Sequence, residues 1–352
     1  MRVYVSPKQQ AHAPQHFIVA GRSRPNPDVP QRIERLLGGI AEQGHSILEP
    51  PDSGERYIRR VHTGAYLDFL RSAYDRWSPN PAAGPEVVPN VHPRRADGAY
   101  PQSVVGQAGY HLSDLACPIG QDTWNSVLWG AHAAAAAALC VRHGAEAQAY
   151  ALCRPPGHHA GPDFAGGFCY LNNAAAAAEI LRDRWARVAI LDIDVHHGNG
   201  TQEIFYARGD VLTVSLHGDP ADYYPFFWGY AEETGIGAGS GATANFPLPR
   251  GTGDDEYLAT LDQAVARIHA FGAEALVVSL GLDAFVKDPL AWLGLTTTGF
   301  ARIAAKIAAI GLPTVLVQEG GYMCDELGQN LASFLGAFEA GRAAVSGPPI
   351  NV

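Results

Sequence analysis

Residues 187–200 read RVAILDIDVHHGNG. The run from Val188 to Leu191 is continuously apolar, which is typical of a strand covered on both faces in a parallel sheet. Two aspartates, two adjacent histidines and two glycines follow at once, which is more polar chemistry than a simple turn requires. This stretch predicts a buried strand whose carboxyl end carries functional groups.

Similar apolar runs recur along the chain and alternate with segments of helical periodicity. The further strands are expected at 2–5, 149–153, 211–216, 275–282 and 313–319, and the helices at about 29–42, 63–74, 172–185, 254–272 and 296–311. Asp254 and Thr298 are helix-start signals, and Gly272 and Gly311 are stop signals. The pattern predicts an α/β fold with a central, mostly parallel β-sheet flanked by helices on both faces.

The length of 352 residues allows one or two domains. Because the chain has no internal repeat, we expect a single domain over residues 1–352. A Pro-rich, non-periodic segment at about 77–118 is too long for a simple connector, so it is expected to be a functional or interface loop.

Composition excludes several classes of protein. The formal net charge is -10 and there is no basic run, so no binding of nucleic acid is expected. The five cysteines form no CxxC pair, which argues against a disulfide framework. No secretory signal is visible, and the most apolar helix-like run, 127–141, is too short to cross a bilayer. We therefore expect a cytoplasmic protein that does not bind membranes.

Polar or ionisable side chains directly follow every later predicted strand. In open parallel sheets, ligands bind beyond the carboxyl ends of the strands. The residues delivered there are His158, His159, Asp192, Asp194, His196, His197, His217, Asp283 and Tyr322.

Asp194 and His196 are one residue apart, so in an extended segment their side chains point the same way. Asp283 from another strand end can complete a set of three mixed ligands, which leaves a position open for water and substrate, as in catalytic zinc sites. The same ligands also accept Fe²⁺. An isolated DxH would more often be a hydrogen-bonded turn, but here the neighbouring strand ends favour the metal.

The pair His158–His159 follows a Pro-Pro-Gly turn and is either a polar loop or, beside a metal, an acid–base group. Asp192 and Asn199 are suitable partners to orient these rings. Tyr322 either packs in the core or donates its hydroxyl to an oxyanion. The aromatic run 223–228, YYPFFW, could be core, but its prolines indicate a loop, so we favour the wall of a substrate channel. His197 is interpreted as a packed, hydrogen-bonded histidine.

The motifs RPPGHH, GGFCYLNNAA, LDIDVHHGNGTQEIFY, VSLH, SLGLDAF and EGGY, in this order, resemble the zinc-dependent histone deacetylase superfamily, which has an arginase-like α/β fold. The resemblance extends from about Val3 to Gly341 and is densest over 149–323. Stretches such as SLHGDPADYYP and GYAEETGIGAG are most similar to the bacterial acetylpolyamine amidohydrolases within that superfamily.

The resemblance implies a role for each matching residue. Asp194, His196 and Asp283 would bind zinc, and His159 would be the general base and acid, with His158 as its partner held by Asp192. Asn199 would stand near His159, and Tyr322 would bind the substrate carbonyl. Gly167, Phe168 and Tyr224 would line the acyl channel with Leu290 at its rim. A structural K⁺ site would use Asp192, Ser215 and Leu216.

The implied function is a zinc-dependent amidohydrolase that removes an acetyl group from a small amine, such as an acetylated polyamine. A homodimer formed through the 77–118 loop would narrow the entrance. Val105 and Ala116 stand where polyamine-selective relatives carry glutamates, which leaves Asp114 as the nearby carboxylate. The alternatives are a lysine deacetylase, a hydrolase of another small amide, and a non-catalytic metal-binding homologue.

Overall fold

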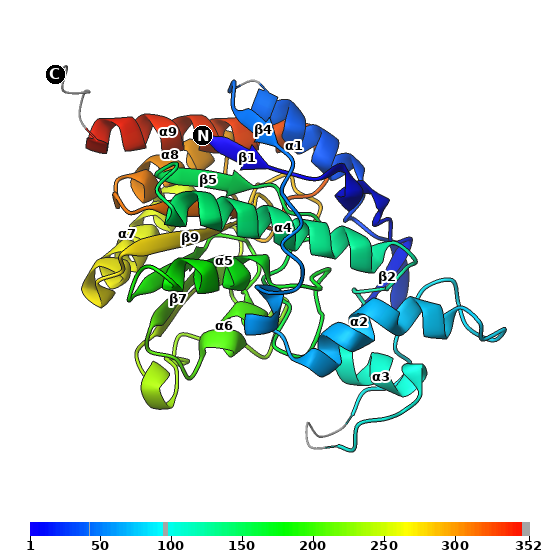
Figure 1. The fold of residues 1–352 in the computed structure, drawn as a ribbon. Helices are drawn as coiled ribbons and strands as arrows, with labels where there is room; N and C mark the ends of the chain where they lie inside the picture. The colour runs from blue at the N-terminus through cyan, green and yellow to red at the C-terminus, as the bar shows by residue number, and fades with distance from the viewer. Residues whose placement is uncertain (42, 94–97, 347–352) are drawn as a thin grey trace.

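An eight-stranded sheet in which all neighbouring strands are parallel forms the centre of the molecule (Figure 1). The computed structural model describes residues 1–41, 43–93 and 98–346. Across the sheet the strands are β4 (Ser46–Leu48), β1 (Arg2–Tyr4), β5 (Gln148–Ala151), β10 (Thr314–Gln318), β9 (Ala275–Leu280), β6 (Val188–Asp192), β7 (Val211–Gly218) and β8 (Thr243–Leu248). The α/β fold expected from the apolar runs is confirmed.

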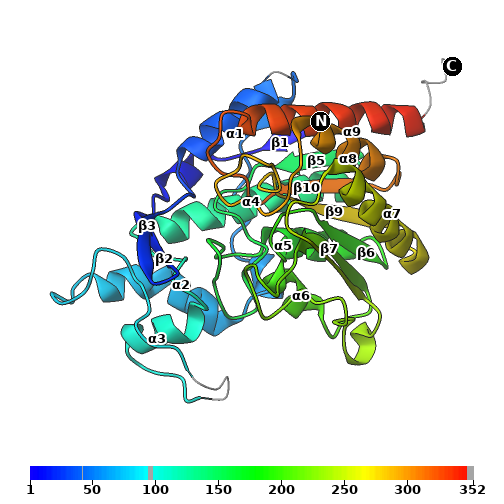
Figure 2. The ribbon, with the colours of Figure 1, turned by 180° about the vertical axis from the view of Figure 1, so that it is seen from behind.

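Helices cover both faces of the sheet because successive strand residues point to opposite sides. One face packs against α1 (Gln31–Ala41), α7 (Asp254–Phe271), α8 (Thr297–Ala308) and α9 (Leu327–Ser346). The other packs against the alanine-rich helices α4 (Thr123–Arg142) and α5 (Asn173–Arg182), which lie in front of the sheet in Figure 1, whereas α7 and α8 come forward in Figure 2. Small alanine side chains let these two helices approach the strands closely.

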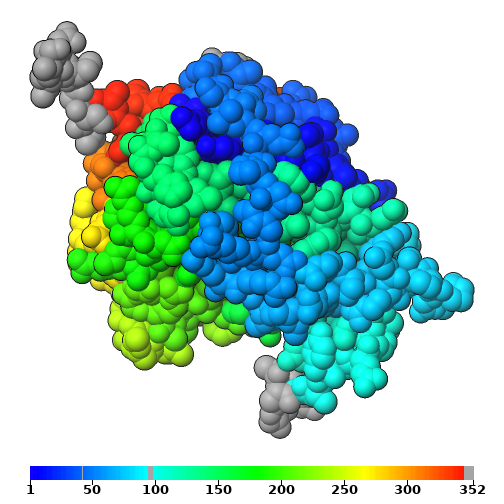
Figure 3. Space-filling model, in the orientation of Figure 1, coloured from blue at the N-terminus to red at the C-terminus, as the bar shows by residue number. Residues whose placement is uncertain are grey.

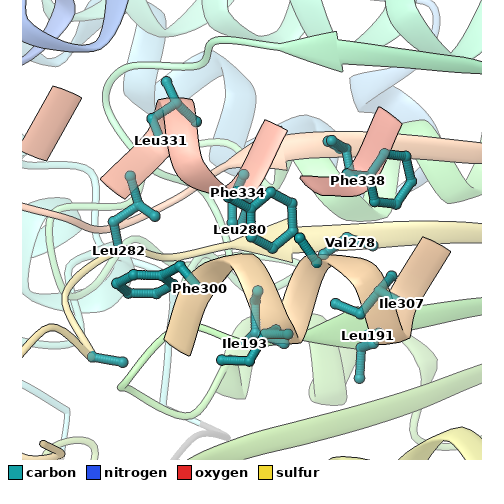
Figure 4. Close-up of a cluster of buried hydrophobic side chains, with 14 of the residues drawn as sticks. Leu191, Ile193, Val278, Leu280, Leu282, Phe300, Ile307, Leu331, Phe334 and Phe338 are labelled. Atoms are coloured by element: carbon teal, nitrogen blue, oxygen red, sulfur yellow. The ribbon is translucent and has the colours of Figure 1, made fainter. Parts of the chain in front are cut away.

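The larger core cluster joins the sheet to α8 and α9. In Figure 4, Phe300 and Ile307 of α8 and Phe334 of α9 lie over the side chains of the central strands, among them Val278 and Leu280 of β9. Leu191, Ile193, Leu282, Leu331 and Phe338 complete the labelled set, and all are almost fully buried. Burial of one such side chain stabilises the fold by about 1.5–3 kcal/mol, so this face holds the strand ends rigidly.

A third cluster of apolar residues lies in the N-terminal part, between α2 (Gly64–Trp77) and α3 (Val104–His111). The segment 77–118 was expected to be loop, but it contains α3, which begins after the capping Ser103. Ala108 and Leu112 pack this short segment against α2. These tertiary contacts explain why a helix forms here although the sequence shows no extended helical periodicity. Residues 94–97 of the segment lie outside the described residues. The light-blue and cyan part of Figure 3 shows this region as a protruding lobe.

Several boundaries differ from those expected. Strand β7 continues to Gly218, so His217 lies inside the strand. Helix α8 is capped by Thr296, whose Oγ1 accepts the N–H of Gly299, and Thr298 is the second residue of the helix. Gly272 ends α7 in the left-handed conformation, as expected. The expected end of the first helix at Glu42 lies outside the described residues.

The sequence patterns did not indicate β4, β8, α6 (Asn199–Phe205) or α9, or the antiparallel hairpin of β2 (His16–Val19) and β3 (Arg22–Pro25). Strand β8 contains Pro247 and lies at the sheet edge, where proline is tolerated. Among the described residues, no helix has the length and apolarity needed to cross a membrane.

Candidate active site

The carboxyl ends of four neighbouring strands bring the polar motifs together. Strands β5, β10, β9 and β6 are adjacent in the sheet, so the loops that follow them meet at one edge. These loops carry His158 and His159, Tyr322, Asp283, and the segment from Asp192 to His197. The expected convergence of these side chains is therefore observed.

Asp194, His196 and Asp283 form a buried group with metal-binding geometry. One potential ligand atom from each lies within 4.8 Å of the others. Nδ1 of His196 is 3.2 Å from Oδ1 of Asp194 and 3.2 Å from Oδ2 of Asp283. Burial alone would lower the pKa of His196, but its contacts with the two carboxylates raise it to about 9. Two buried carboxylates call for a positive charge between them, and a divalent cation fits this donor set.

The surrounding backbone leaves room for these ligands. Oδ2 of Asp283 is buried and accepts no hydrogen bond from the described residues. A Cβ atom on Gly320 would lie 2.1 Å from that oxygen and 2.6 Å from Oδ2 of Asp194, and one on Gly281 would lie 2.3 Å from the latter. The buried Asp283 oxygen, whose ion-pair partner is the candidate ligand His196, and the two required glycines support a metal site at this point.

His158 and His159 have different partners. Nδ1 of His158 is 2.9 Å from Oδ2 of Asp192, and Nδ1 of His159 donates to Oδ1 of Asn199 at 2.7 Å. The two rings are 4.0 Å apart. Because Nδ1 of His159 carries the proton in this bond, its Nε2 is left as the basic atom. Both partners are the ones expected from the sequence.

The pKa values of the two histidines are shifted in opposite directions. Burial alone would lower the pKa of His158, but the carboxylates of Asp192 and Asp194 raise it to about 10. Burial and the positive charges of His158 and His196 lower the pKa of His159 well below its usual value. The first ring is therefore charged at neutral pH and the second is neutral.

Tyr322 is buried at the end of the β10 loop and borders the same cavity as His159. Its N–H donates to Oδ2 of Asp288 at 2.7 Å, and its ring lies 4.7 Å from the guanidinium of Arg32. Nε of that arginine also donates to the carbonyl of Gly321 at 2.7 Å. Burial raises the pKa of Tyr322 well above 10, so its hydroxyl keeps the proton that it can donate.

A cavity of about 870 Å³ opens in front of these groups. Its walls include Gly167, Phe168, Tyr224 and Leu290, the four residues expected to line the channel. The aromatic run 223–228 forms one wall, so its interpretation as channel rather than core agrees with the structure, and Phe227 is 80% exposed there. Residues 17–20 of the unexpected β2–β3 hairpin contribute another part of the wall.

Asp114 joins two sides of this cavity. Its Oδ2 accepts the N–H of Gly167 at 2.8 Å and the hydroxyl of Tyr224 at 2.7 Å. Ala116 also lines the cavity, and Val105 is not among its lining residues. Asp114 therefore sets the spacing of the channel walls.

His197 and His217 support the aromatic wall from behind. Nε2 of His197 donates to Oε1 of Gln202 at 3.0 Å, and that side chain donates to Glu233 at 2.7 Å. Glu233 accepts the N–H of Gly229 at 2.9 Å, whose carbonyl accepts Nε2 of His217 at 2.8 Å. His197 is thus packed and hydrogen-bonded, as interpreted from the sequence.

Asp192 and Ser215 border a second, much smaller cavity of about 10 Å³. Oγ of Ser215 donates to Nδ1 of His217 at 2.7 Å, because the other nitrogen of that ring carries the proton. The lone pairs of Ser215 are therefore left available. Leu216 follows in the same strand but does not line this cavity.

Residues 26–338 match the family described as histone deacetylase domain. The chain belongs to the histone deacetylase family. As a member of it, with the buried Asp194, His196 and Asp283 group, it is a metal-dependent deacetylase, that is, an amidohydrolase.

Relatives within the histone deacetylase family align over almost the whole chain. An acetylpolyamine amidohydrolase of Burkholderia pseudomallei is 46% identical over 341 residues, which cover 97% of this chain and 99% of that protein. Acetylpolyamine amidohydrolase 1 of Pseudomonas aeruginosa is 43% identical over 339 residues, with 95% and 97% covered. The crystal structure of acetylpolyamine aminohydrolase from Burkholderia pseudomallei superposes with a TM-score of 0.94 over 97% of this chain and 99% of that one.

Sequence reasoning missed the residues that support this histone deacetylase site from outside the motifs. Arg32 and Asp288 contact site residues but belong to no polar strand end, and Tyr223, expected only as part of the 223–228 wall, also stacks on His196. Arg32 could have been found from one feature of the sequence. It lies four residues after Asp28, at a buried position of α1, and forms an ion pair with that aspartate. The other two act through tertiary contacts that no local pattern reveals.

Proposed function

We propose that this enzyme hydrolyses the amide bond of N-acetylated polyamines and releases acetate and a free amine. The main support for this proposal is the buried set of Asp194, His196 and Asp283 beside a cavity with an aromatic wall. Alignment over nearly the full chain with several acetylpolyamine amidohydrolases supports the substrate.

The residues around the cation would carry the proton transfers. A divalent cation held by the three ligands would polarise the amide carbonyl and acidify water. Nε2 of His159 accepts the proton of the attacking water as its oxygen bonds to the carbonyl carbon. The hydroxyl of Tyr322 donates to the oxygen that becomes negative. His158, charged and held by Asp192, supplies a fixed positive charge beside the reaction.

The second half of the reaction reverses the role of His159. The carbon–nitrogen bond breaks, and the proton held on Nε2 passes to the departing nitrogen, so a neutral amine and acetic acid form. The acid still carries the second proton of the water and loses it to solvent, which leaves acetate. Asn199 keeps Nδ1 as a donor in both halves. A neutral amide at this position, rather than a carboxylate, leaves His159 a weaker base and a stronger acid, which suits protonation of an alkylamine.

The charge of the cavity supports a cationic substrate. Among the described residues, its lining includes the carboxylates of Asp114, Glu203 and Asp222, together with the guanidinium of Arg250 and the charged ring of His158. The carboxylates attract the free ammonium groups of an acetylated polyamine, and the aromatic faces of the 223–228 wall add cation–π attraction.

A panel of three substrates on zinc-loaded protein tests the proposal: N-acetylputrescine, an acetyl-lysine peptide and a neutral acetanilide. We expect the highest kcat/KM for N-acetylputrescine and a loss of this preference in the double variant Glu203→Gln, Asp222→Asn. Hydrolysis of the peptide without hydrolysis of any acetylated diamine would assign a lysine deacetylase instead. If neither the wild type nor Tyr322→Phe hydrolyses any of the three amides, the protein is a non-catalytic metal-binding homologue.

We also propose Zn²⁺ as the native ion, with Fe²⁺ as the alternative that the same ligands accept.

A K⁺ ion is proposed beside Asp192, Ser215 and the carbonyl of Leu216. The small cavity next to Asp192 and Ser215 is close to the minimum for one water-sized occupant. Anaerobic reconstitution with each metal, and unfolding in K⁺ compared with tetramethylammonium, test the two assignments.

The chain is proposed to be one catalytic domain that forms a homodimer through residues 77–118. The sheet supports the first part, because it takes strands from residues 2–4 to 314–318. A single unfolding transition and a light-scattering mass of two chains are expected. Two transitions, or a monomer at micromolar concentration, would contradict these proposals.

A further inference from the structure

An aromatic stack extends from the metal site to the cavity wall. The ring of Tyr223 lies nearly parallel to that of His196, with centroids 4.8 Å apart and planes at 14°. Trp292 stacks on Tyr223 at 4.7 Å and 29°, and the guanidinium of Arg250 lies 5.3 Å from the Trp292 ring. Two rings cannot share one face at these distances, so Tyr223 is sandwiched between the metal-site histidine and Trp292.

His196 depends on this stack for its orientation. A metal-binding histidine is usually held by a hydrogen bond from its second ring nitrogen. Nδ1 of His196 faces Asp194 and Asp283, whereas Nε2 makes no hydrogen bond with residues 1–41, 43–93 or 98–346. The rings of His159 and Tyr224 meet that of His196 edge-on, with centroids 5.9 and 6.1 Å away, so the parallel contact is the one with Tyr223.

The surrounding chain holds Tyr223 and Trp292 in place. The hydroxyl of Tyr223 donates to the carbonyl of Leu290, and Nε1 of Trp292 donates to the carbonyl of Leu248 at 3.3 Å. Gly218 at the end of β7 lies beneath them. A Cβ atom there would be 2.6 Å from Cδ1 of Trp292 and 2.9 Å from Cδ1 of Tyr223. The stack therefore requires glycine at this position.

We propose that Tyr223 and Trp292 are positioning residues that fix the imidazole plane of His196 and thereby set the metal affinity of the site. The inference rests on the metal role of Asp194, His196 and Asp283. It assigns a second purpose to one member of the aromatic wall, because Tyr223 stacks on a candidate metal ligand and also lines the cavity. Rigid orientation of a ligand ring raises metal affinity because less freedom is lost on binding.

The test uses Co²⁺ as a spectroscopic probe, with affinity measured by chelator competition and geometry by visible absorption. Tyr223→Phe keeps the stack and removes only the bond to Leu290, so Co²⁺ affinity and spectrum should stay close to wild type. Tyr223→Leu removes the stack and should weaken Co²⁺ binding by about 10- to 100-fold, the range seen when groups that orient metal ligands are lost. Its spectrum should change, and kcat should fall more than KM rises.

Gly218→Ala gives an independent test that leaves both rings chemically intact. The added methyl group displaces the stack and should also weaken Co²⁺ binding. Gly38→Ala, at a glycine with no neighbouring atom within 4 Å, is the control. If folded Gly218→Ala binds Co²⁺ as tightly as wild type, the positioning role is wrong, even where Tyr223→Leu fails to fold. A wild-type chain that binds no Co²⁺ would instead refute the metal site itself and, with it, this inference.

Discussion

At the scale of single residues, His158 and His159 show how neighbours give one side-chain type two states. His158 faces the carboxylate of Asp192, whereas His159 faces the neutral amide of Asn199. The first ring keeps a proton at neutral pH and the second does not. Since the charged ring lies only 4.0 Å away, it suppresses protonation of its neighbour, and the pair offers one base and one fixed charge.

Tyr322→Phe should lower kcat/KM for N-acetylputrescine by about 10²–10³-fold, because one donor to the oxyanion is removed. The melting temperature should change little, since the hydroxyl makes no hydrogen bond with the described part of the chain. Steady-state kinetics on zinc-loaded protein measures the effect. Tyr206→Phe, at a tyrosine outside the cavity lining, is the matched control; equal losses in both variants would contradict the role of Tyr322.

His62 should make folding sensitive to acid. Its Nδ1 donates to the carbonyl of Gly161 at 2.8 Å and its Nε2 accepts the N–H of Asn172 at 2.9 Å. Burial lowers the pKa of His62 to about 4. From pH 6.5 down to 4 the unfolded chain binds a proton that the native chain does not, so the free energy of unfolding falls.

The contribution of His62 to this fall is about 3 kcal/mol, fully retained above pH 6.5 and lost by pH 4. Urea unfolding at several pH values should therefore show a shallower fall in His62→Asn than in wild type. His16→Asn, at an exposed histidine, should keep the wild-type fall. Identical pH profiles for wild type and His62→Asn would show that His62 is not the responsible group.

Residues whose chemistry is local could be predicted from the sequence, and those that act through distant contacts could not. Asp194 and His196 are one residue apart after an apolar run, and this spacing already places both on one side. Tyr223 lies in an aromatic run that favours a channel wall over the core but does not indicate a contact with the metal site. Only the folded chain shows that its ring covers His196.

At the scale of elements, α1 and α9 cross at two glycines. A Cβ atom on Gly39 would lie 2.1 Å from the carbonyl oxygen of Gly328, and one on Gly328 would lie 2.6 Å from that of Arg35. Backbone thus touches backbone where the helices cross, above the sheet in Figure 1. The crossing places Arg32 of α1 where it can reach the carbonyl of Gly321 beside Tyr322.

The adjacent glycines of α1 provide a matched pair of variants. Gly39→Ala should destabilise the protein by about 1–3 kcal/mol, because the methyl group forces the helices apart. Gly38→Ala should stabilise it by up to about 1 kcal/mol, since Gly38 is exposed and alanine is the better helix former. Denaturant unfolding of both variants measures the difference; a destabilised Gly38→Ala would disprove this account.

Among the elements, those with strong periodicity were predictable and those defined by their surroundings were not. The strands β6, β7 and β9 are mostly apolar and fully buried because helices cover both faces. Helix α3 is short, follows a Pro-rich stretch and is held by contacts with α2, so its own sequence gives little signal. The same holds for the exposed edge strand β4.

At the scale of the whole molecule, the metal ligands tie together the loops after β6 and β9, two strands that are neighbours in the sheet but far apart in the sequence. Adding Zn²⁺ at about 100 times its dissociation constant should raise the free energy of unfolding by about 2.7 kcal/mol. The variant Asp283→Asn should show no such rise with Zn²⁺, whereas Asp222→Asn, at an exposed cavity residue, should show the wild-type rise. Denaturant unfolding with Zn²⁺ and with chelator measures the difference in free energy; a wild-type rise in Asp283→Asn would contradict the ligand role.

The strand order also governs how a newly made chain acquires activity. Strand β10 is the last strand in the sequence but lies between β5 and β9 in the sheet. Until the ribosome has released residues 314–318, both of these strands present an unpaired edge, which is prone to aggregation. Tyr322 emerges only four residues later. The event that closes the sheet therefore also delivers the last group of the active site, so incomplete chains are both vulnerable and inactive.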